Sequence, residues 1–185
     1  MYFAKVEQAV DSTKDIVVTY GGKYINAYFH ACSGDKTEDV SAIWGKQNIP
    51  YLKSVESKGE EGYKNYTSKV KLTVSDLQTK LNKSSTTKCS INKDNEEIVE
   101  ILSYTNSGRI DKVKIGGVVY KAEELRTLLG LRSTNFTVNK EGEKVIFNVK
   151  GNGHGVGMSH VGADYYAKIG YTYVGIIKQY YTGVD

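Results

Sequence analysis

The sequence predicts an α+β fold: a mostly antiparallel sheet of β-hairpins with short flanking helices. Two observations predict it. Runs rich in Val, Ile and Tyr recur in pairs around short turns of glycine or asparagine, which is the pattern of β-hairpins. Short amphipathic stretches with helix-capping residues stand between and after these pairs. A chain of 185 residues can bury a sizeable core, so we expect residues 1–185 to form a single domain.

The first expected hairpin joins Val17–Tyr20 to Lys23–Cys32 through Gly21-Gly22. Its second strand alternates strictly, so its side chains divide between two faces. The face predicted to be core carries Ile25, Ala27, Phe29 and Ala31. The opposite face carries Tyr24, Asn26, Tyr28, His30 and Cys32. This mixture of groups suits the wall of a cleft, and a plainly exposed polar face is an equal alternative.

The remaining elements follow from the same two patterns. Further strands are expected over Ile98–Tyr104, Ile110–Ile115, Val118–Tyr120, Phe136–Val138 and Val145–Val149. Helices are expected over Ser75–Leu81, Ala122–Leu129, His160–Ile169 and Val174–Tyr181. The spacing of Ser75 and Gln78 indicates a capping box, and Gly130 suits the residue that ends a helix. Two polar segments are predicted to be exposed: Lys58–Lys64, and an excursion over residues 82–97.

Composition and charge exclude several classes of protein. Charged residues make up 25% and hydrophobic residues 39%, which is typical of a globular protein rather than a disordered one. No apolar run approaches the roughly 20 residues of a membrane helix, so we expect no membrane contact from these residues. The 25 basic residues are spread along the chain without a concentrated patch, which argues against nucleic acid as a partner. The two cysteines, Cys32 and Cys89, suit a disulfide, a metal pair or two buried thiols.

The densest chemical signal is the run from Gly151 to His160, in which four glycines alternate around His154. Glycine permits positive φ and close approach of the backbone to a ligand. A helix that begins near Ser159 would present free N–H groups to such a ligand. A histidine held in this frame can serve as a positioned hydrogen-bond partner or as an acid or base.

Three generic sites do not fit this run. A phosphate-binding loop requires Lys-Ser or Lys-Thr where Met158-Ser159 stands. The dinucleotide fingerprint G-x-G-x-x-G lacks its third glycine in both registers, and Ser159 lacks the G-x-S-x-G nucleophile elbow. A purely structural glycine-rich turn around a hydrogen-bonded histidine remains an open alternative.

The run nevertheless resembles a known family. The pattern G-x-GHGVGMS-x-x-GA, from Gly151 to Ala163, resembles the stage II sporulation protein D and amidase-enhancer family of bacterial cell-wall proteins. Three more segments match the family in the same order: Ala27–Thr37 with Trp44-Gly45, Arg126–Phe136, and Tyr180–Gly183. Two positions depart from it, because Cys32 and Asp35 stand where many members carry Ser and Gly.

The resemblance implies a peptidoglycan partner. The sporulation members are lytic transglycosylases, which cleave glycan strands during wall remodelling and engulfment with formation of an anhydro sugar. This chemistry needs a carboxylic acid that protonates the glycosidic oxygen. The alternative function is a non-catalytic wall-binding module that recruits or activates an amidase. The family also implies an extracytoplasmic location, at the cell wall or in the intermembrane space of the sporangium, and a membrane-anchored parent protein.

The family's proposed catalytic acid is a glutamate on a helix upstream of the residues matched here. No motif supports Glu7, Glu38 or Glu56 as its replacement, so no catalytic residue is assigned in this chain. The resemblance covers the C-terminal portion of such a protein. The residues predicted to bind substrate are Tyr28, His30, Ser33, Gly34, Gly153, His154, Gly155, Gly157, Met158, Ser159 and Gly162.

The family requires no metal or organic cofactor, and none is expected here. A less favoured alternative is zinc bound through His30 and Cys32, two residues apart on one strand face. With His154 as a third ligand, these residues would suit a small zinc hydrolase.

Overall fold

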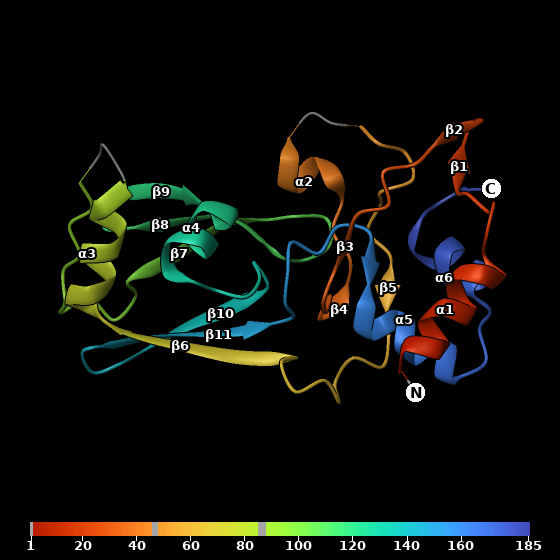
Figure 1. The fold of residues 1–185 in the computed structure, drawn as a ribbon. Coiled ribbons are helices and arrows are strands. Elements are labelled where there is room, and N and C mark those ends of the chain that lie inside the picture. Colours follow the sequence, from red (N-terminus) through yellow and green to blue (C-terminus); the bar gives the residue numbers. More distant parts are fainter. Residues whose placement is uncertain (1, 46–47, 85–87) are drawn as a thin grey trace.

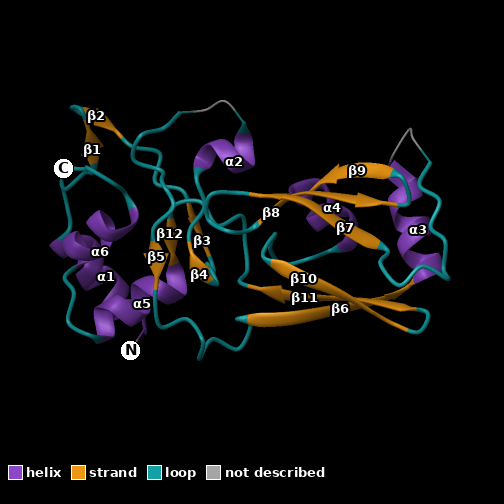
Figure 2. Ribbon diagram, turned by 180° about the vertical axis from the view of Figure 1, so that it is seen from behind, coloured by secondary structure: helices purple, strands orange, loops and turns teal. Residues whose placement is uncertain are grey.

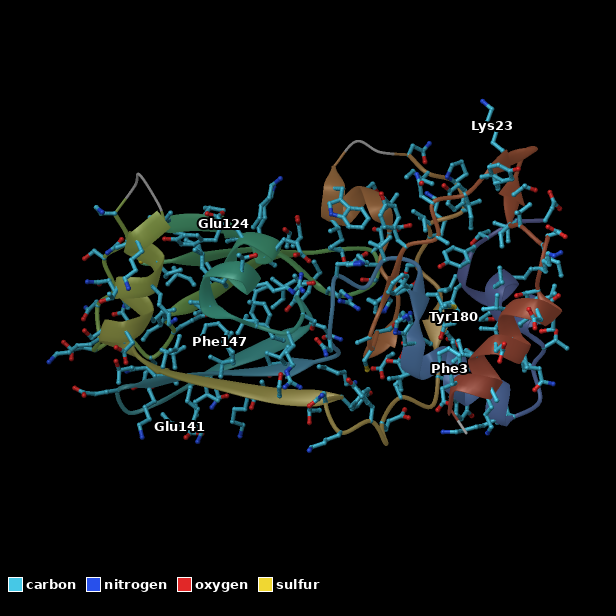
Figure 3. The ribbon with its side chains drawn as sticks, in the orientation of Figure 1. Phe3, Lys23, Glu124, Glu141, Phe147 and Tyr180 are labelled. Atoms are coloured by element: carbon cyan, nitrogen blue, oxygen red, sulfur yellow. The ribbon has the colours of Figure 1, made fainter. Side chains whose placement is uncertain are left out.

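The computed structural model describes residues 2–45, 48–84 and 88–185, which form two lobes side by side (Figure 1). The terminal lobe contains residues 2–65 and 151–185, and the central lobe contains residues 66–150. Each lobe has its own hydrophobic core. Phe147 belongs to the core of the central lobe and Tyr180 to that of the terminal lobe (Figure 3). The mixture of helices and antiparallel sheets confirms the α+β class.

Two three-stranded antiparallel sheets form the layers of the central lobe (Figure 2). One has the order β7-β8-β9, with bounds Val99–Tyr104, Ile110–Ile115 and Val118–Lys121. The other has the order β10-β11-β6, with bounds Phe136–Glu141, Lys144–Lys150 and Thr67–Thr73. The predicted hairpins of this lobe are therefore confirmed, whereas β6 was not predicted. Its lysines point outward between half-buried residues, so it lacks the apolar density of its neighbours.

Two helices complete the central lobe: α3 (Val74–Ser84) and α4 (Ala122–Leu129). The helix α4 has the predicted bounds and ends at Gly130 in the left-handed conformation (φ 70°). The helix α3 begins earlier than predicted. Its first turn is capped by Thr73, whose Oγ1 accepts a hydrogen bond from the N–H of Asp76 and donates one to the Asp76 carboxylate. The N-cap is therefore Thr73 rather than Ser75.

The terminal lobe is assembled from both ends of the chain around shorter elements. Its helices are α1 (Tyr2–Ser12), α2 (Val40–Trp44), α5 (His160–Lys168) and α6 (Tyr173–Tyr180). Its strands are β1 (Thr19–Tyr20), β2 (Lys23–Tyr24), β3 (Phe29–His30), β4 (Asp35–Lys36), β5 (Glu56–Ser57) and β12 (Met158–Ser159). The helices α5 and α6 and the β1–β2 hairpin were predicted, while α1 and α2 were not. None of the described helices is both long and apolar enough to cross a membrane.

The long strand predicted over Lys23–Cys32 is wrong, and so is its division into two faces. Only Lys23–Tyr24 and Phe29–His30 are strands, and the chain bends between them. Phe29, predicted to be core, is 56% exposed, whereas His30 and Cys32 are buried. The reason is that the glycine-rich run packs against the imidazole and thiol face and covers it.

The polar segment Lys58–Lys64 is not uniformly exposed as predicted. Glu60 is buried, because its carboxylate is surrounded by hydrogen-bond donors. In the excursion of residues 82–97, the residues from 90 to 97 are exposed or half-buried, and Cys89 is buried in the central core. Residues 85–87 of this excursion lie outside the described residues. Both cysteines are free thiols, which decides between the three states considered from the sequence.

Candidate functional site

The glycine-rich run lies directly against the segment from Tyr28 to Gly34. β12 pairs in parallel with β3, with Met158 opposite Phe29 and Ser159 opposite His30. A second link joins Cys32 to Asn152 in an antiparallel bridge. From the sequence, the face of the first segment that carries Tyr28, His30 and Cys32 was considered as the wall of a cleft, and the two segments would then face one another across it. They form one continuous hydrogen-bonded surface instead.

Glycine is required in this run because the backbone is left-handed and close to other protein atoms. The φ angles are 82°, 114°, 85° and 73° at Gly151, Gly153, Gly155 and Gly157. A Cβ at Gly155 would lie 2.6 Å from Cζ of Arg109, and one at Gly157 would overlap the carbonyl oxygen of Tyr28. The close approach predicted for these glycines is therefore made to the protein itself.

His30 is a buried, neutral imidazole beneath this surface. Its Nε2 lies 2.7 Å from Oγ of Ser33 and its Nδ1 lies 3.2 Å from the carbonyl oxygen of Val156. The carbonyl can only accept, so Nδ1 carries the proton and Nε2 accepts from the Ser33 hydroxyl. Burial, followed by the nearby Arg109 cation, lowers the pKa of His30 to about 3.

His154 lies half-buried at the outer side of the same loop. Its Nδ1 accepts a hydrogen bond of 3.0 Å from the N–H of Val156, so Nε2 carries the proton of the neutral ring. Burial lowers the pKa of His154, and the Arg126 cation lowers it further. At neutral pH this side chain therefore provides a fixed N–H donor rather than a cation.

An aromatic surface made of Tyr28, Trp44 and His154 covers this part of the terminal lobe. The ring centroids of Tyr28 and Trp44 are 4.8 Å apart, and those of Trp44 and His154 are 5.2 Å apart. Tyr28 and Trp44 remain 38% and 39% exposed. On the other side of the β3 strand, Phe29 stacks on His160 at 4.7 Å. Adjacent strand residues point to opposite faces, so this pair is a separate aromatic site.

Glu60 is a buried carboxylate that links separate segments of the terminal lobe through hydrogen bonds. It is 1% exposed and accepts four hydrogen bonds, a pattern that an ionised carboxylate satisfies. Its Oε2 accepts from the thiol of Cys32 at 3.2 Å and from the N–H of Gly34 at 2.6 Å. Its Oε1 accepts from the hydroxyls of Ser57 and Ser159. Burial, followed by the Glu60 charge, raises the pKa of Cys32 to about 12, so the thiol stays a donor.

Cys32 and Asp35, the two residues that depart from the family pattern, each form side-chain hydrogen bonds with neighbouring residues. Cys32 takes the donor role that a serine hydroxyl at this position would also supply. Asp35 adopts a φ of 94°, a conformation that glycine takes without strain. Its carboxylate accepts hydrogen bonds from Oη of Tyr66 at 2.6 Å and from Nζ of Lys150.

A second buried carboxylate joins the two lobes. Oε2 of Glu38 accepts from the hydroxyls of Thr105 and Ser107 at 2.7 and 2.6 Å, both in the turn between β7 and β8. From the same turn, Arg109 enters the terminal lobe, is 2% exposed, and donates through Nη2 to the carbonyl oxygens of Ser33 and Lys36. Burial lowers the pKa of this guanidinium, and the charges of Glu38, Glu123 and Glu60 act in the opposite direction.

The predicted substrate-binding residues thus fall into two groups. Four reach or approach the surface: Tyr28, Gly153, His154 and Met158. The others are interior residues that support it: His30, Ser33, Gly34, Gly155, Gly157, Ser159 and Gly162. Within the described part of the chain, no three His, Cys, Asp or Glu side chains are grouped to hold a metal ion. The thiol of Cys32 is bonded to Glu60 and both nitrogens of His30 are bonded, which leaves neither residue open as a ligand.

Sequence reasoning assigned no role to Glu60 and Arg109, and it noted Trp44 only as part of a segment that matches the family, not as a binding residue. Two signals were available, since Trp44 is the only tryptophan and Arg109 is one of only three arginines among 25 basic residues. All three arginines lie around the glycine-rich run: Arg132 accepts from Gly153 through its carbonyl, Arg109 lies under Gly155, and Arg126 lies near His154. Glu60 carried no such signal.

Known proteins show similarity over nearly the whole chain. Stage II sporulation protein D of Bacillus amyloliquefaciens is 35% identical over 182 residues, which is 98% of this chain and 50% of that protein. Stage II sporulation protein D of Bacillus subtilis is 34% identical over the same shares. The amidase enhancer of Bacillus subtilis is 28% identical over 227 residues, 97% of this chain and 32% of that protein. The chain therefore spans about half the length of the sporulation proteins that it matches.

A family model described as "Domain of unknown function (DUF8618)" matches residues 52–157, which include the buried Glu60, the Arg109 junction and most of the glycine-rich run. That stretch is more than half of the chain. The resemblance to sporulation protein D and the amidase enhancer, inferred from the residues around His154, is confirmed by these relatives. By sequence, then, this protein belongs to the DUF8618 family and is a homologue of stage II sporulation protein D.

Proposed function

We propose that this chain is the glycan-binding part of a bacterial cell-wall protein, and that it holds peptidoglycan strands on the aromatic surface of Tyr28, Trp44 and His154. The observation that carries the proposal is this cluster of neighbouring, partly exposed rings at the motif shared with the sporulation proteins. The names of the relatives support a role in sporulation.

The chemistry of the surface suits a sugar. Exposed rings of Tyr and Trp offer flat apolar area at low entropic cost, against which the C–H face of a pyranose can pack. Beside them, the ring of His154 is held in place by the Val156 N–H bond to Nδ1, and its Nε2–H lies near the backbone carbonyl of Phe29 at the edge of this surface. A hydroxyl or acetamide oxygen of the sugar is its natural partner. Such contacts bind a neutral glycan without a metal or cofactor.

The finer part of the proposal is that the intact protein cleaves the strand as a lytic transglycosylase. The buried carboxylates of this chain are unsuited to be the acid, because Glu38 and Glu60 only accept hydrogen bonds from fixed donors. Because the family resemblance implies a glutamate upstream of the matched residues, we assign the acid to no residue of this chain. We expect this chain alone to release no anhydromuropeptides from purified sacculi, and their release would contradict this assignment.

A second candidate function is recruitment of a wall amidase, which the name of the amidase-enhancer relative favours. A module of this kind binds glycan and raises the activity of the amidase without cutting the strand itself. Stimulation of a purified amidase by the chain, with no release of anhydro sugars by the parent protein, would support this function. Either function places the protein outside the cytoplasm, where its substrate is.

Binding of chitotetraose, measured by isothermal titration calorimetry, tests the proposed surface. Trp44→Ala and His154→Ala should weaken binding about tenfold, the loss of roughly 1.4 kcal/mol of contact, while melting stays near wild type. Tyr24→Ala is the matched control, because this tyrosine is 80% exposed in the separate β1–β2 hairpin. Equal affinities for all three variants and the wild type would overturn the proposed surface.

A further inference from the structure

The central lobe places an arginine beside the loop that carries His154. Arg126 lies on α4, and its Nε donates a hydrogen bond of 3.3 Å to the carbonyl oxygen of Arg132. The same carbonyl oxygen accepts a hydrogen bond of 2.8 Å from the N–H of Gly153. One shared acceptor therefore links the guanidinium to the residue that precedes His154. After burial, the charge of Arg126 lowers the pKa of His154 most, which agrees with this proximity.

The ion-pair partner of Arg126 faces the helix that carries Trp44. Nη1 of Arg126 donates to Oε2 of Glu123 at 3.1 Å, one turn earlier on α4. Glu123 lines the groove between the lobes, and the opposite wall comes from α2 and includes Gly45, the residue directly after Trp44. The ring of Trp44 lies 5.2 Å from that of His154. The Arg126–Glu123 pair and the aromatic surface therefore adjoin where α4 and α2 face each other (Figure 1).

Arg126 keeps donors that the protein does not use. A guanidinium has N–H donors on three nitrogens and no acceptor. Nε is bonded to the Arg132 carbonyl and Nη1 to Glu123, so the side chain is fixed at two points. Nη2 forms no hydrogen bond within the described part of the chain, and it is not buried. The side chain is 27% exposed, and it presents the N–H groups of Nη2 to a ligand.

These free donors suit a neutral acceptor. The charge of Arg126 is already paired with the carboxylate of Glu123, so the site does not call for an anion. The neutral oxygens of a peptidoglycan glycan belong to hydroxyl groups and to acetamide carbonyls. A hydroxyl both donates and accepts, whereas a carbonyl oxygen only accepts and so matches a group that only donates. The acetamide carbonyl is therefore the partner that the chemistry of Nη2 favours.

We propose that Arg126 is a specificity-determining residue of the glycan site, and that its Nη2 donates to the acetamide carbonyl oxygen of a sugar that rests on the aromatic surface. This inference rests on the proposed glycan-binding function and adds to it the recognition of the N-acetyl group. The rings of Tyr28 and Trp44 contact the face of the sugar, which pyranoses with and without the acetamide share. Arg126 distinguishes between them, so the two lobes together form the complete site.

Calorimetric titration of the whole chain with two neutral tetrasaccharides tests this assignment. Chitotetraose carries acetamide groups, and cellotetraose carries hydroxyl groups in their place on the same glucose backbone. The wild type should bind chitotetraose roughly tenfold more tightly, as expected for one hydrogen bond from a charged donor. In Arg126→Gln this preference should fall to about two- or threefold, while the affinity for cellotetraose stays the same.

Two further variants separate recognition from a structural role. Arg126→Lys keeps a cation beside Glu123 but lacks Nη2, so it should lose the preference for chitotetraose as Arg126→Gln does. Lys114→Gln is the matched control, because it removes the cation of an ion pair with Glu100 on a lysine that does not line the groove. This control should keep the wild-type affinities for both sugars. Melting curves verify that each variant is folded.

The ratio of the two affinities decides the outcome. An equal loss of affinity for both sugars in the Arg126 variants would show that this residue only holds the loop at Gly153 in place, and would overturn the proposal. A preference that survives in both variants would overturn it as well. Equal binding of the two sugars by the wild type would overturn the recognition of the N-acetyl group while leaving glycan binding intact. Failure of both sugars to bind would contradict the proposed function instead.

Discussion

Single hydrogen-bonding residues hold the candidate site in place, and Glu60 is the clearest case. Its carboxylate collects donors from Cys32, Gly34, Ser57 and Ser159, which come from three separate stretches of the chain. A buried acceptor with this many donors cannot be altered without leaving donors unpaired. Its contribution is therefore to stability, even though it lies close to the proposed binding surface.

Substitutions at this position test the structural role. Glu60→Gln turns one acceptor oxygen into an NH₂ group that faces existing donors, and it should lower the free energy of unfolding by about 2–4 kcal/mol. Cys32→Ser keeps a donor toward Glu60 and should cost less than about 1 kcal/mol. Urea unfolding measures both. Equal stability of Glu60→Gln and wild type would show that the carboxylate is not the hub of this network.

His30 makes the stability of the protein depend on pH. Burial lowers the pKa of this imidazole from 6.5 to about 3, so the unfolded chain binds a proton in this window and the folded protein does not. The free energy of unfolding therefore falls as the pH decreases from 6.5 toward 3. His154 acts in the same direction, because burial also lowers its pKa.

We expect the urea midpoint of the wild type to decrease between about pH 7 and about pH 4.5, and the decrease to be smaller in His30→Gln. The variant lacks the imidazole, so the difference between the two proteins gives the contribution of His30 apart from that of the carboxylates, which also bind protons in acid. The same decrease in both proteins would assign the effect to the carboxylates.

At the scale of elements, the local sequence pattern predicted a helix or hairpin correctly wherever the residues that start, turn or end that element belong to the same short stretch. The hairpins β7–β8 and β10–β11 and the helix α4 carry both their apolar periodicity and their turn or cap within one short stretch. The strand predicted over Lys23–Cys32 was wrong because its alternation is strand-like, while its burial is decided by the glycine-rich run, which pairs Asn152 with Cys32 and Ser159 with His30. Such a covering segment cannot be read from the local pattern.

The glycine-rich run is itself an element whose conformation can be tested. Gly155→Ala and Gly157→Ala combine a left-handed φ with a clash, and each should cost about 2 kcal/mol or more. Gly170→Ala isolates the φ effect, because φ is 95° there and no atom lies within 4 Å of an added Cβ. Gly62→Ala has open space and no left-handed φ, and should be nearly neutral. Equal melting temperatures for all four variants would contradict this account of the glycine-rich run.

At the scale of the whole molecule, the site lies where two lobes with separate cores meet. Arg109 and the hydroxyls of Thr105 and Ser107 reach from the central lobe to Glu38 and to the backbone of the terminal lobe. The family motif around His154 was readable from the sequence, because its glycines are contiguous. The roles of Glu60 and Arg109 were not, since each is isolated in sequence and gains its partners only when distant segments of the chain come together.

The central claim is that glycan strands bind on the aromatic surface of Tyr28, Trp44 and His154. The single tryptophan of the chain lies in that surface, so its fluorescence reports on this site alone. Titration with chitotetraose should change the Trp44 emission along a saturable curve whose dissociation constant agrees with calorimetry, and His154→Ala should shift that curve to higher ligand concentration. Binding detected by calorimetry with no change in Trp44 emission would place the glycan elsewhere on the protein and contradict the claim.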